Sequence, residues 1–120
     1  QETICIDGDG GFIMNIQELE VVKRLNLPIK FFVLNNNGYV SIRNTQNTHF
    51  EGRLVASSPM SGLSLPSVRN NAYTYGLTAP KASVYKKADG SFAARPMEDL
   101  APFLDREEFR DNMFIEIVNE

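Results

Sequence analysis

Residues 3–12 read TICIDGDGGF, and this stretch decides the fold. Thr3–Ile6 is a short apolar and β-branched run, which predicts a buried strand. The five residues at 7–11, Asp-Gly-Asp-Gly-Gly, predict a tight turn at the end of that strand. Open α/β sheets hold their ligands just beyond the carboxyl ends of their strands. The stretch therefore marks both the start of a sheet and a candidate site.

An amphipathic pattern follows the turn. Its apolar residues recur at every third position, at Ile16, Leu19, Val22 and Leu25. Charged residues lie between them, so we expect an amphipathic helix of about three turns. Asn15, with Glu18 three positions later, resembles a capping box and places the helix start at Asn15. Pro28 ends the segment.

A second apolar run, Ile29–Leu34, has the length of a strand and ends in the polar segment Asn35-Asn36-Asn37-Gly38. Two interpretations of this ending stay open. Asn-Gly is the strongest short signal for a hairpin, which would join the run to Tyr39–Ile42. The other interpretation is a second polar turn at the carboxyl end of a parallel strand, like the one after the first run.

The remainder of the chain mixes helical, extended and polar patterns. After Tyr39–Arg43, a polar stretch that ends at Leu65 is rich in Ser, Gly, Asn and Pro. It predicts a long loop, in which Thr45–Leu65 is the most mobile part. The elements expected after it are a helix from Pro66 to Gly76, a strand at Ala82–Tyr85, a turn at Ala88–Ser91, a helix at Glu98–Phe109 that opens at Pro96 or Met97, and a strand at Met113–Val118.

Strands that alternate with helices are typical of an open parallel sheet. We therefore predict a single α/β domain over residues 1–120, with three α/β/α layers and a mainly parallel sheet. A chain of 120 residues with a 42% hydrophobic fraction can form one such core. The chain begins at Gln1 and enters an apolar run at once. We interpret it as an N-terminally truncated piece of a longer polypeptide.

Composition excludes several classes of protein. The net charge of −3 disfavours general binding to nucleic acid or to anionic membranes. Apolar runs stay well below the roughly 18 residues that a membrane helix needs. Cys5 is the only cysteine, which excludes an internal disulfide and favours a reducing, cytoplasmic setting.

The two polar turns carry the candidate chemistry. Glycines let a backbone approach an anion closely, and a helix that follows adds unpaired N–H groups. The Asp9 carboxylate and the Asn36 amide oxygen are hard ligands suited to Mg²⁺ or Ca²⁺. Magnesium takes few protein ligands and completes its octahedron with phosphate oxygens and water. The pair of turns thus predicts a metal-bridged diphosphate.

Other interpretations of these residues are weaker. A calcium-binding EF-hand loop requires glycine at its sixth position, which Phe12 occupies here. A phosphatase of the haloacid dehalogenase type, with an aspartyl nucleophile, would need a later lysine and a further acidic pair on another strand, and no convincing pair is present. His49 in the polar segment is most simply solvated, and Cys5 is most simply a small buried residue.

The combined pattern resembles a known family. Gly8-Asp9-Gly10 is followed by Asn35-Asn36 at the end of an apolar run, with 26 residues (10–35) between Asp9 and Asn36. This is similar to the thiamine diphosphate motif of the acetolactate synthase and pyruvate decarboxylase-like enzymes. Flanking residues match as well, at Gly10-Gly11-Phe12, Met14-Asn15-Ile16-Gln17-Glu18-Leu19, Leu27-Pro28-Ile29-Lys30 and Asn36-Asn37-Gly38-Tyr39. The resemblance is strong over Ile4–Arg43 and is closest to acetolactate-synthase-like large subunits.

The resemblance implies a magnesium site and a thiamine diphosphate site. Asp9 is in the position of the carboxylate ligand of Mg²⁺, Asn36 in that of the amide ligand, and Gly38 in that of the backbone-carbonyl ligand. The cofactor phosphates would approach three glycines and a second turn, at Gly8, Gly10, Gly11, Tyr39 and Val40. Tyr39, Ser41 and Ile42 would face the thiazolium or the substrate.

The implied reaction is decarboxylation of a 2-oxo acid and transfer of the two-carbon unit to an aldehyde or a second 2-oxo acid. Decarboxylases of the superfamily can carry an acidic residue where Ile42 lies, so the aliphatic side chain favours a carboligase. The glutamate that activates the cofactor belongs, in the family, to a pyrimidine-binding domain of another subunit. We therefore expect a homo-oligomer, and a chain that is inactive alone. The alternative is a binding module without catalysis.

Overall fold

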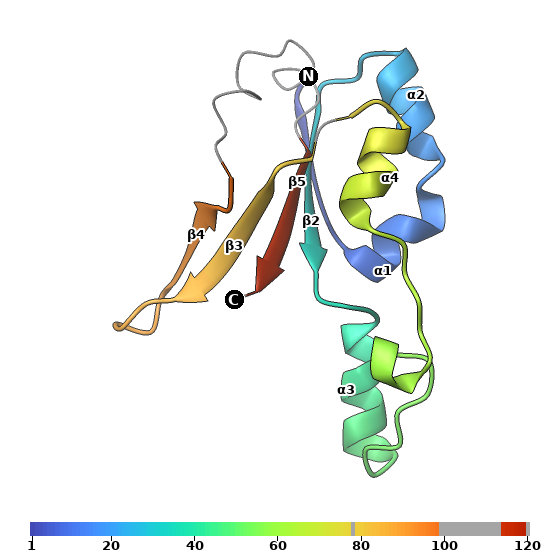
Figure 1. The fold of residues 1–120 in the computed structure, drawn as a ribbon, viewed down its shortest axis with the longest axis vertical. Helices are drawn as coiled ribbons and strands as arrows, with labels where there is room; N and C mark the ends of the chain where they lie inside the picture. Colours follow the sequence, from blue (N-terminus) through green and yellow to red (C-terminus); the bar gives the residue numbers. More distant parts are fainter. Residues whose placement is uncertain (78, 99–113, 120) are drawn as a thin grey trace.

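The computed structural model describes residues 1–77, 79–98 and 114–119. Five strands form one sheet in the order β1-β2-β5-β3-β4 (Figure 1). Their bounds are Thr3–Gly8 (β1), Ile29–Asn35 (β2), Lys81–Lys86 (β3), Phe92–Pro96 (β4) and Phe114–Asn119 (β5). The helices are α1 (Asp9–Phe12), α2 (Glu18–Arg24), α3 (Val40–His49) and α4 (Val68–Thr74), with short 3-10 helices η1 (Ile13–Asn15) and η2 (Pro59–Ser61).

The sheet is parallel except at one edge. β1 pairs with β2, β2 with β5, and β5 with β3, all in parallel, and only β4 is antiparallel to its neighbour β3. This confirms an α/β fold with a mainly parallel sheet. It also shows that the hairpin interpretation of Asn37-Gly38 is wrong, since β2 leads into a helix and both of its neighbours run parallel to it.

The first turn differs from the prediction. β1 continues through Asp7 to Gly8, and α1 begins at Asp9 without an intervening turn. The strand is also less buried than expected, because the side chains of Ile4 and Ile6 are 66% and 68% exposed. Because α1 starts where the strand stops, Asp9 lies in the first turn of a helix and is buried rather than presented on a loop.

The helix that follows is shorter than predicted. Asn15 is the last residue of η1, and α2 begins at Glu18. The residue before α2, Gln17, has helical dihedral angles, and no side chain caps the helix. The predicted capping box at Asn15 is therefore wrong, because a capping residue needs extended dihedral angles and the chain is already helical there.

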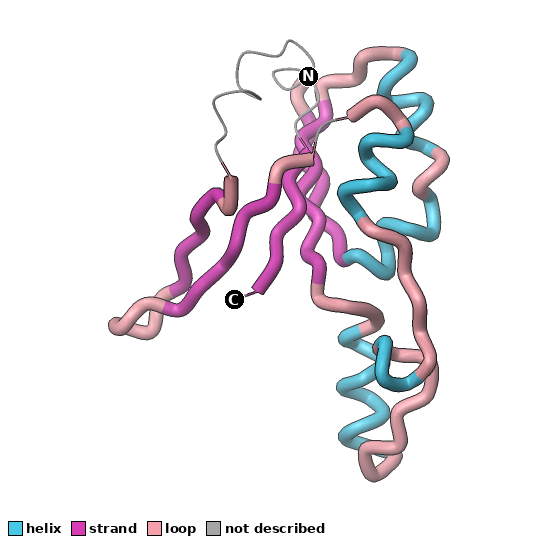
Figure 2. Tube along the Cα trace, in the orientation of Figure 1, coloured by secondary structure: helices cyan, strands magenta, loops and turns pink. Residues whose placement is uncertain are grey.

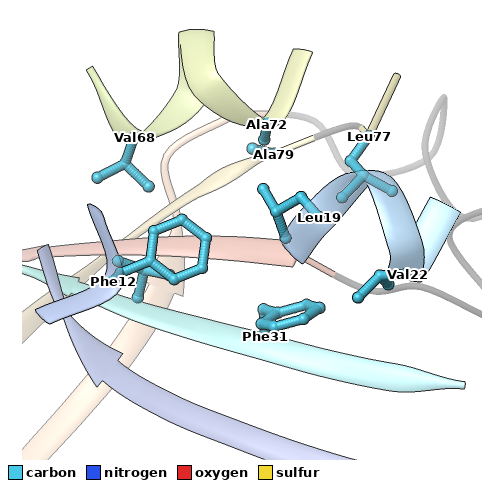
Figure 3. Close-up of a cluster of buried hydrophobic side chains, with 9 residues drawn as sticks. Phe12, Leu19, Val22, Phe31, Val68, Ala72, Leu77 and Ala79 are labelled. Carbon is cyan, nitrogen blue, oxygen red and sulfur yellow. The ribbon is translucent and has the colours of Figure 1, made fainter. Parts of the chain in front are cut away.

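The core lies between the sheet and α1, α2 and α4, which cover one of its faces (Figures 1 and 2). Phe12 of α1 meets Phe31 of β2 edge-on, with ring centroids 6.2 Å apart. Leu19 and Val22 of α2 complete the apolar surface on that side (Figure 3). The buried apolar side chains together are Phe12, Leu19, Val22, Phe31, Val33, Val68, Ala72, Leu77 and Ala79.

The opposite face of the sheet is covered by no helix of the described residues (Figure 1). Large apolar side chains on β1, β2 and β4 are exposed there: Ile4, Ile6, Leu34 and Phe92. The predicted helix at Glu98–Phe109 lies outside the described residues except for Glu98. Its predicted opening at Pro96 is wrong, because Pro96 is the last residue of β4.

The segment predicted as a long loop, residues 44–65, contains the second half of α3 and η2, so the prediction holds only for residues 50–58 and 62–65. α3 extends away from the carboxyl end of the sheet, and none of its residues is buried (Figure 1). The return path is held by hydrogen bonds, among them Gln46 Nε2 to the Val55 carbonyl at 3.0 Å and Ser57 Oγ to Gln46 Oε1 at 2.7 Å. The mobility expected of this segment remains a prediction.

The later elements follow the sequence more closely. Ser67 caps α4, because its Oγ accepts a hydrogen bond from the Asn70 N–H at 3.2 Å. Gly76, at a φ of +73°, ends it as expected. The turn at Ala88–Ser91 leads into β4, a strand that was not predicted.

Candidate functional site

Asp9 is the centre of the candidate site. It is 6% exposed and lies at the carboxyl end of β1, in the first turn of α1. Its Oδ1 accepts a hydrogen bond from the Gly10 N–H at 2.9 Å, and its Oδ2 accepts one from the Gly38 N–H at 3.1 Å. The Asp9 carboxylate thus binds an N–H group in the first turn of α1 and a second N–H group beyond the end of β2.

Asn35–Gly38, which we call the Asn turn, follows β2 and lies beside Asp9. Asn37 and Gly38 have φ angles of +58° and +121°. Asparagine tolerates the left-handed region better than most residues, and glycine enters it without a steric penalty. A Cβ on Gly38 would also lie 2.6 Å from the Ser57 carbonyl oxygen. These two residues turn the chain sharply enough to point backbone groups of the Asn turn at Asp9.

The Asn36 side-chain amide lies where the two chain segments meet. It is 3.0 Å from Asp9 Oδ1 and 2.7 Å from the Gly38 carbonyl oxygen, and with its NH₂ group on that side it donates a hydrogen bond to each of them. We call Asp9 Oδ1, Asn36 Oδ1 and Gly38 O the oxygen cluster. A 180° rotation of the Asn36 amide would bring its oxygen, in place of the NH₂ group, next to the other two oxygens. The cluster can therefore be satisfied by this amide alone or by a cation at its centre.

The three glycines after Asp7 differ in the space around them. A Cβ on Gly10 would lie 2.5 Å from Cδ1 of the Tyr39 ring, and one on Gly11 would lie 2.6 Å from Asp7 Oδ1, the end of a side chain that can rotate away. Gly8 differs, since its nearest neighbour would be Asn36 Nδ2 at 3.8 Å. Of these three glycines, only Gly8 has free space in front of it.

The remaining predicted residues lie at the start of α3. Tyr39 precedes the helix and Val40 is its first residue, and both are partly buried. Ser41 and Ile42 follow on the helix and are exposed. The structure thus brings Asp9, Asn36 and Gly38 together, with the Tyr39 ring packed against Gly10.

Two residues that the sequence analysis missed hold the Asn turn. The Arg43 guanidinium donates to the carbonyl oxygens of Asn36 and Asn37, each at 3.0 Å. Glu116 Oε1 accepts a hydrogen bond from Asn35 Nδ2 at 2.7 Å. No sequence pattern singled out Arg43, because its helix has no apolar stripe. Glu116 could have been noticed, since it is a single carboxylate within the apolar run Phe114–Val118.

A cavity of about 300 Å³ lies beside the Asn turn. Its polar lining comes from Asp9, Asn35, Asn37, Ser67, Lys81 and Glu116. In the described part of the chain, no three His, Cys, Asp or Glu side chains are grouped as a metal site. A cation at the oxygen cluster would therefore combine one carboxylate with neutral oxygens, a donor set that suits Mg²⁺.

The fold and this site define a class of α/β domain in which polar groups at the carboxyl ends of adjacent parallel strands form the candidate ligand site. The sequence matches the model of the family "Thiamine pyrophosphate enzyme, C-terminal TPP binding domain" over residues 1–105. The chain belongs to this family of thiamine pyrophosphate enzymes. Thiamine pyrophosphate is the same compound as thiamine diphosphate.

Curated relatives agree with the family. The chain is 46% identical over 50 residues to the acetolactate synthase isozyme 2 large subunit of Escherichia coli, which covers 42% of this chain and 9% of the relative. It is 32% identical over 108 residues to the chloroplastic acetolactate synthase 1 of Oryza sativa, covering 84% of this chain and 16% of the relative. The chloroplastic acetolactate synthase of Arabidopsis thaliana gives 33% over 106 residues, with the same coverage. The chain spans less than a fifth of these relatives.

Within residues 1–77, 79–98 and 114–119, no helix is long and apolar enough to cross a bilayer.

Proposed function

We propose that this domain binds thiamine diphosphate through a Mg²⁺ ion held by the oxygen cluster. The Asp9 carboxylate, the Asn36 side-chain oxygen and the Gly38 carbonyl would supply three of the six ligands. Diphosphate oxygens and water would supply the others, as is usual for protein-bound magnesium. Membership of the family supports the cofactor, and the donor set supports the ion.

The observation that carries the proposal is the spacing within the oxygen cluster. With Mg–O bonds of 2.0–2.1 Å, two ligands at adjacent corners of an octahedron lie about 2.9 Å apart. The Asn36 amide lies 3.0 Å from Asp9 Oδ1 and 2.7 Å from the Gly38 carbonyl oxygen, so turning its oxygen toward them gives spacings close to this value. The cluster thus has room for a cation, and without one the Asn36 NH₂ group donates to both oxygens.

The diphosphate would approach the backbone at Gly8. The free space in front of Gly8 is next to the oxygen cluster, because the nearest atom to a Cβ there belongs to Asn36. Gly10 and Gly11 are packed against Tyr39 and Asp7. We therefore propose that Gly10 and Gly11 shape the site, and that Gly8 is the glycine closest to the phosphates.

We propose further that the parent enzyme is a carboligase or decarboxylase of the acetolactate synthase kind. When bound, thiamine diphosphate supplies the electron sink needed to decarboxylate a 2-oxo acid. The residues of this domain would hold and orient the diphosphate. The exposed aliphatic side chain of Ile42 supports transfer of a two-carbon unit over simple release of an aldehyde.

The activating glutamate would come from a pyrimidine-binding domain of another subunit in a homo-oligomer. On this proposal the chain alone binds the cofactor weakly and does not turn over substrate. We also propose a reducing, cytoplasmic setting, although the relatives from Oryza sativa and Arabidopsis thaliana are named as chloroplastic.

Calorimetric titration of the chain with thiamine diphosphate tests the proposal. We expect binding with Mg²⁺ and none with EDTA. Asp9→Asn, which keeps an oxygen acceptor but removes the charge, should weaken binding at least about tenfold, or ~1.4 kcal/mol. Asp89→Asn is the matched control, because Asp89 lies in the exposed turn between β3 and β4, and it should bind like the parent.

Two results would overturn the proposal: binding that is equal with Mg²⁺ and with EDTA, or no Mg²⁺-dependent binding at all. Unchanged binding by Asp9→Asn would refute the assignment of the ligands. Carbon dioxide release from pyruvate, measured on the same samples, decides whether the chain binds without turnover.

A further inference from the structure

Glu116 is a carboxylate buried in the sheet, where a charge is energetically unfavourable. It lies in β5, is 2% exposed, and faces the same side of the sheet as its register partner Val33. Taking a carboxylate out of water is unfavourable unless hydrogen bonds or a counter-charge compensate. An apolar residue would pack equally well at this buried position of the strand. The presence of a carboxylate there therefore requires an explanation other than packing.

The contacts of Glu116 point to the Asn turn. Oε1 accepts the hydrogen bond from Asn35 Nδ2 at 2.7 Å. Oε2 lies 3.6 Å from Lys81 Nζ and has no hydrogen-bond partner among the described residues. Lys81 therefore offsets the charge, and the strong, charge-assisted bond goes to Asn35.

Asn35 passes this restraint on to the backbone. While its Nδ2 donates to Glu116, its Oδ1 accepts a hydrogen bond from the Asn37 N–H at 3.2 Å. Rotation of the Asn35 amide would break both bonds. The amide thus ties β5 to Asn37, the residue with a φ of +58° that directs the chain into Gly38.

We propose that Glu116 is a positioning residue for the oxygen cluster. By holding Asn35, it fixes the Asn turn in the conformation that presents Asn36 and Gly38 to Asp9. Its effect on ligand binding rests on the proposed function, whereas its effect on the Asn turn does not. Glu116 acts through a hydrogen bond to Asn35, so an uncharged acceptor of the same shape replaces it.

Amide hydrogen exchange in the ligand-free chain tests the restraint. We expect Glu116→Leu to speed exchange of the Asn37 and Gly38 amides about tenfold relative to the amides of α2, in line with the loss of one charge-assisted hydrogen bond. Glu116→Gln should stay within about twofold of the parent, because its side-chain oxygen still accepts from Asn35. Ser83→Ala, at another fully buried polar position on the same face, is the control and should leave the ratio unchanged.

Two exchange results would overturn the proposal. One is an equal acceleration of α2 and of the Asn turn in Glu116→Leu, which indicates a general loss of stability. The other is a Glu116→Gln variant as fast as Glu116→Leu, which indicates that the charge and not the hydrogen bond matters. If Glu116→Leu does not fold, Asn35→Ala replaces it, and the same local acceleration is expected.

Binding of thiamine diphosphate with Mg²⁺ supplies the second measurement. We expect about tenfold weaker binding in Glu116→Leu, near-parental binding in Glu116→Gln, and no further loss when Asn35→Ala is added to Glu116→Leu. Parental binding by Glu116→Leu, together with loss in Asp9→Asn, would defeat the positioning role and leave the proposed function standing. Absence of Mg²⁺-dependent binding in the parent would defeat the proposed function, and the exchange data would still decide the role of Glu116.

Discussion

The main-chain N–H of Gly38 donates to the Asp9 carboxylate at 3.1 Å, a hydrogen bond that joins residues 29 positions apart. It exists because β1 and β2 are parallel neighbours, so their carboxyl ends lie at the same edge of the sheet. The carboxylate that we propose as a magnesium ligand is therefore also a structural acceptor. Substitutions of Asp9 must therefore be tested both for cofactor binding and for stability of the fold.

Asp9→Ala should cost stability as well as binding. It leaves the N–H groups of Gly10 and Gly38 without their acceptor, and one unsatisfied buried N–H costs ~1–3 kcal/mol. Urea unfolding of both variants checks this, with Asp9→Asn expected to lose less than Asp9→Ala. An alanine variant as stable as the parent would contradict the structural role of the carboxylate.

Gly8 and Gly10 should respond differently to alanine. Gly8→Ala has room for its Cβ and should leave the unfolding free energy within about 1 kcal/mol of the parent. It should nevertheless weaken binding of thiamine diphosphate, because the methyl group fills the space proposed for the phosphates. Gly10→Ala should lower stability by ~1–3 kcal/mol through overlap with the Tyr39 ring.

Thermal unfolding and calorimetry on the same variants test this pair. Tyr39→Ala in the Gly10→Ala background is the control, since removing the ring removes the overlap and should reduce the added cost of the methyl group. If Gly8→Ala binds thiamine diphosphate as tightly as the parent, the phosphates do not lie in front of Gly8.

The Asn36 amide should change orientation when magnesium binds. In the metal-free chain, its NH₂ group turned toward Asp9 and Gly38 makes two hydrogen bonds and relieves the repulsion within the oxygen cluster. A cation requires the oxygen there instead. We expect large chemical-shift changes of the Asn36 side-chain NH₂ signals on addition of Mg²⁺ and thiamine diphosphate, with the Asn47 side chain on exposed α3 as a reference. Unperturbed Asn36 signals at saturation would contradict this.

The ion pair between Arg69 and Glu98 should give stability a dependence on acid pH. Desolvation raises the pKa of Glu98, but the Arg69 guanidinium at 2.7 Å and the Lys81 N–H at 2.9 Å outweigh it and hold the pKa below the ordinary value of 4.5. A carboxyl group with a depressed pKa stabilises the fold above its unfolded-state pKa, and this contribution is lost as pH falls through the folded-state value.

Glu98→Gln tests that dependence. At neutral pH the variant should be less stable than the parent by under about 1 kcal/mol, as expected for a partly exposed pair. The difference should vanish at pH values below the folded-state pKa of Glu98. A constant difference over the whole acid range, measured by urea unfolding, would show that the charge of Glu98 does not contribute.

The sequence predicted those parts of the fold that local patterns encode. β2 and β5 are apolar runs of strand length, and α4 lies between a serine cap and a terminal glycine. α3 was missed because a helix with no buried residue has no apolar stripe. β4 was missed because Phe92–Pro96 is short, mostly exposed and ends in proline.

The candidate site, like the fold, was predictable from the sequence only in part. Asp9 and Asn36 were predictable because they lie in the polar segments that follow two apolar runs, and Gly38 was added by the resemblance to the family. The partners that hold them were not, since Glu116 is 81 positions from Asn35 and only the pairing of β2 with β5 brings the two together. That these residues bind magnesium and thiamine diphosphate stays a prediction.

On the proposed function, the divalent cation binds at the oxygen cluster. Mn²⁺ in place of Mg²⁺, with thiamine diphosphate present, tests this through paramagnetic broadening of the backbone amide signals. We expect the amides of Asp9, Asn36 and Gly38 to broaden first and most, and excess Mg²⁺ to reverse the effect. Broadening centred on the exposed carboxylates Glu18 and Glu20 of α2, with the signals around Asp9 and Gly38 left sharp, would contradict it.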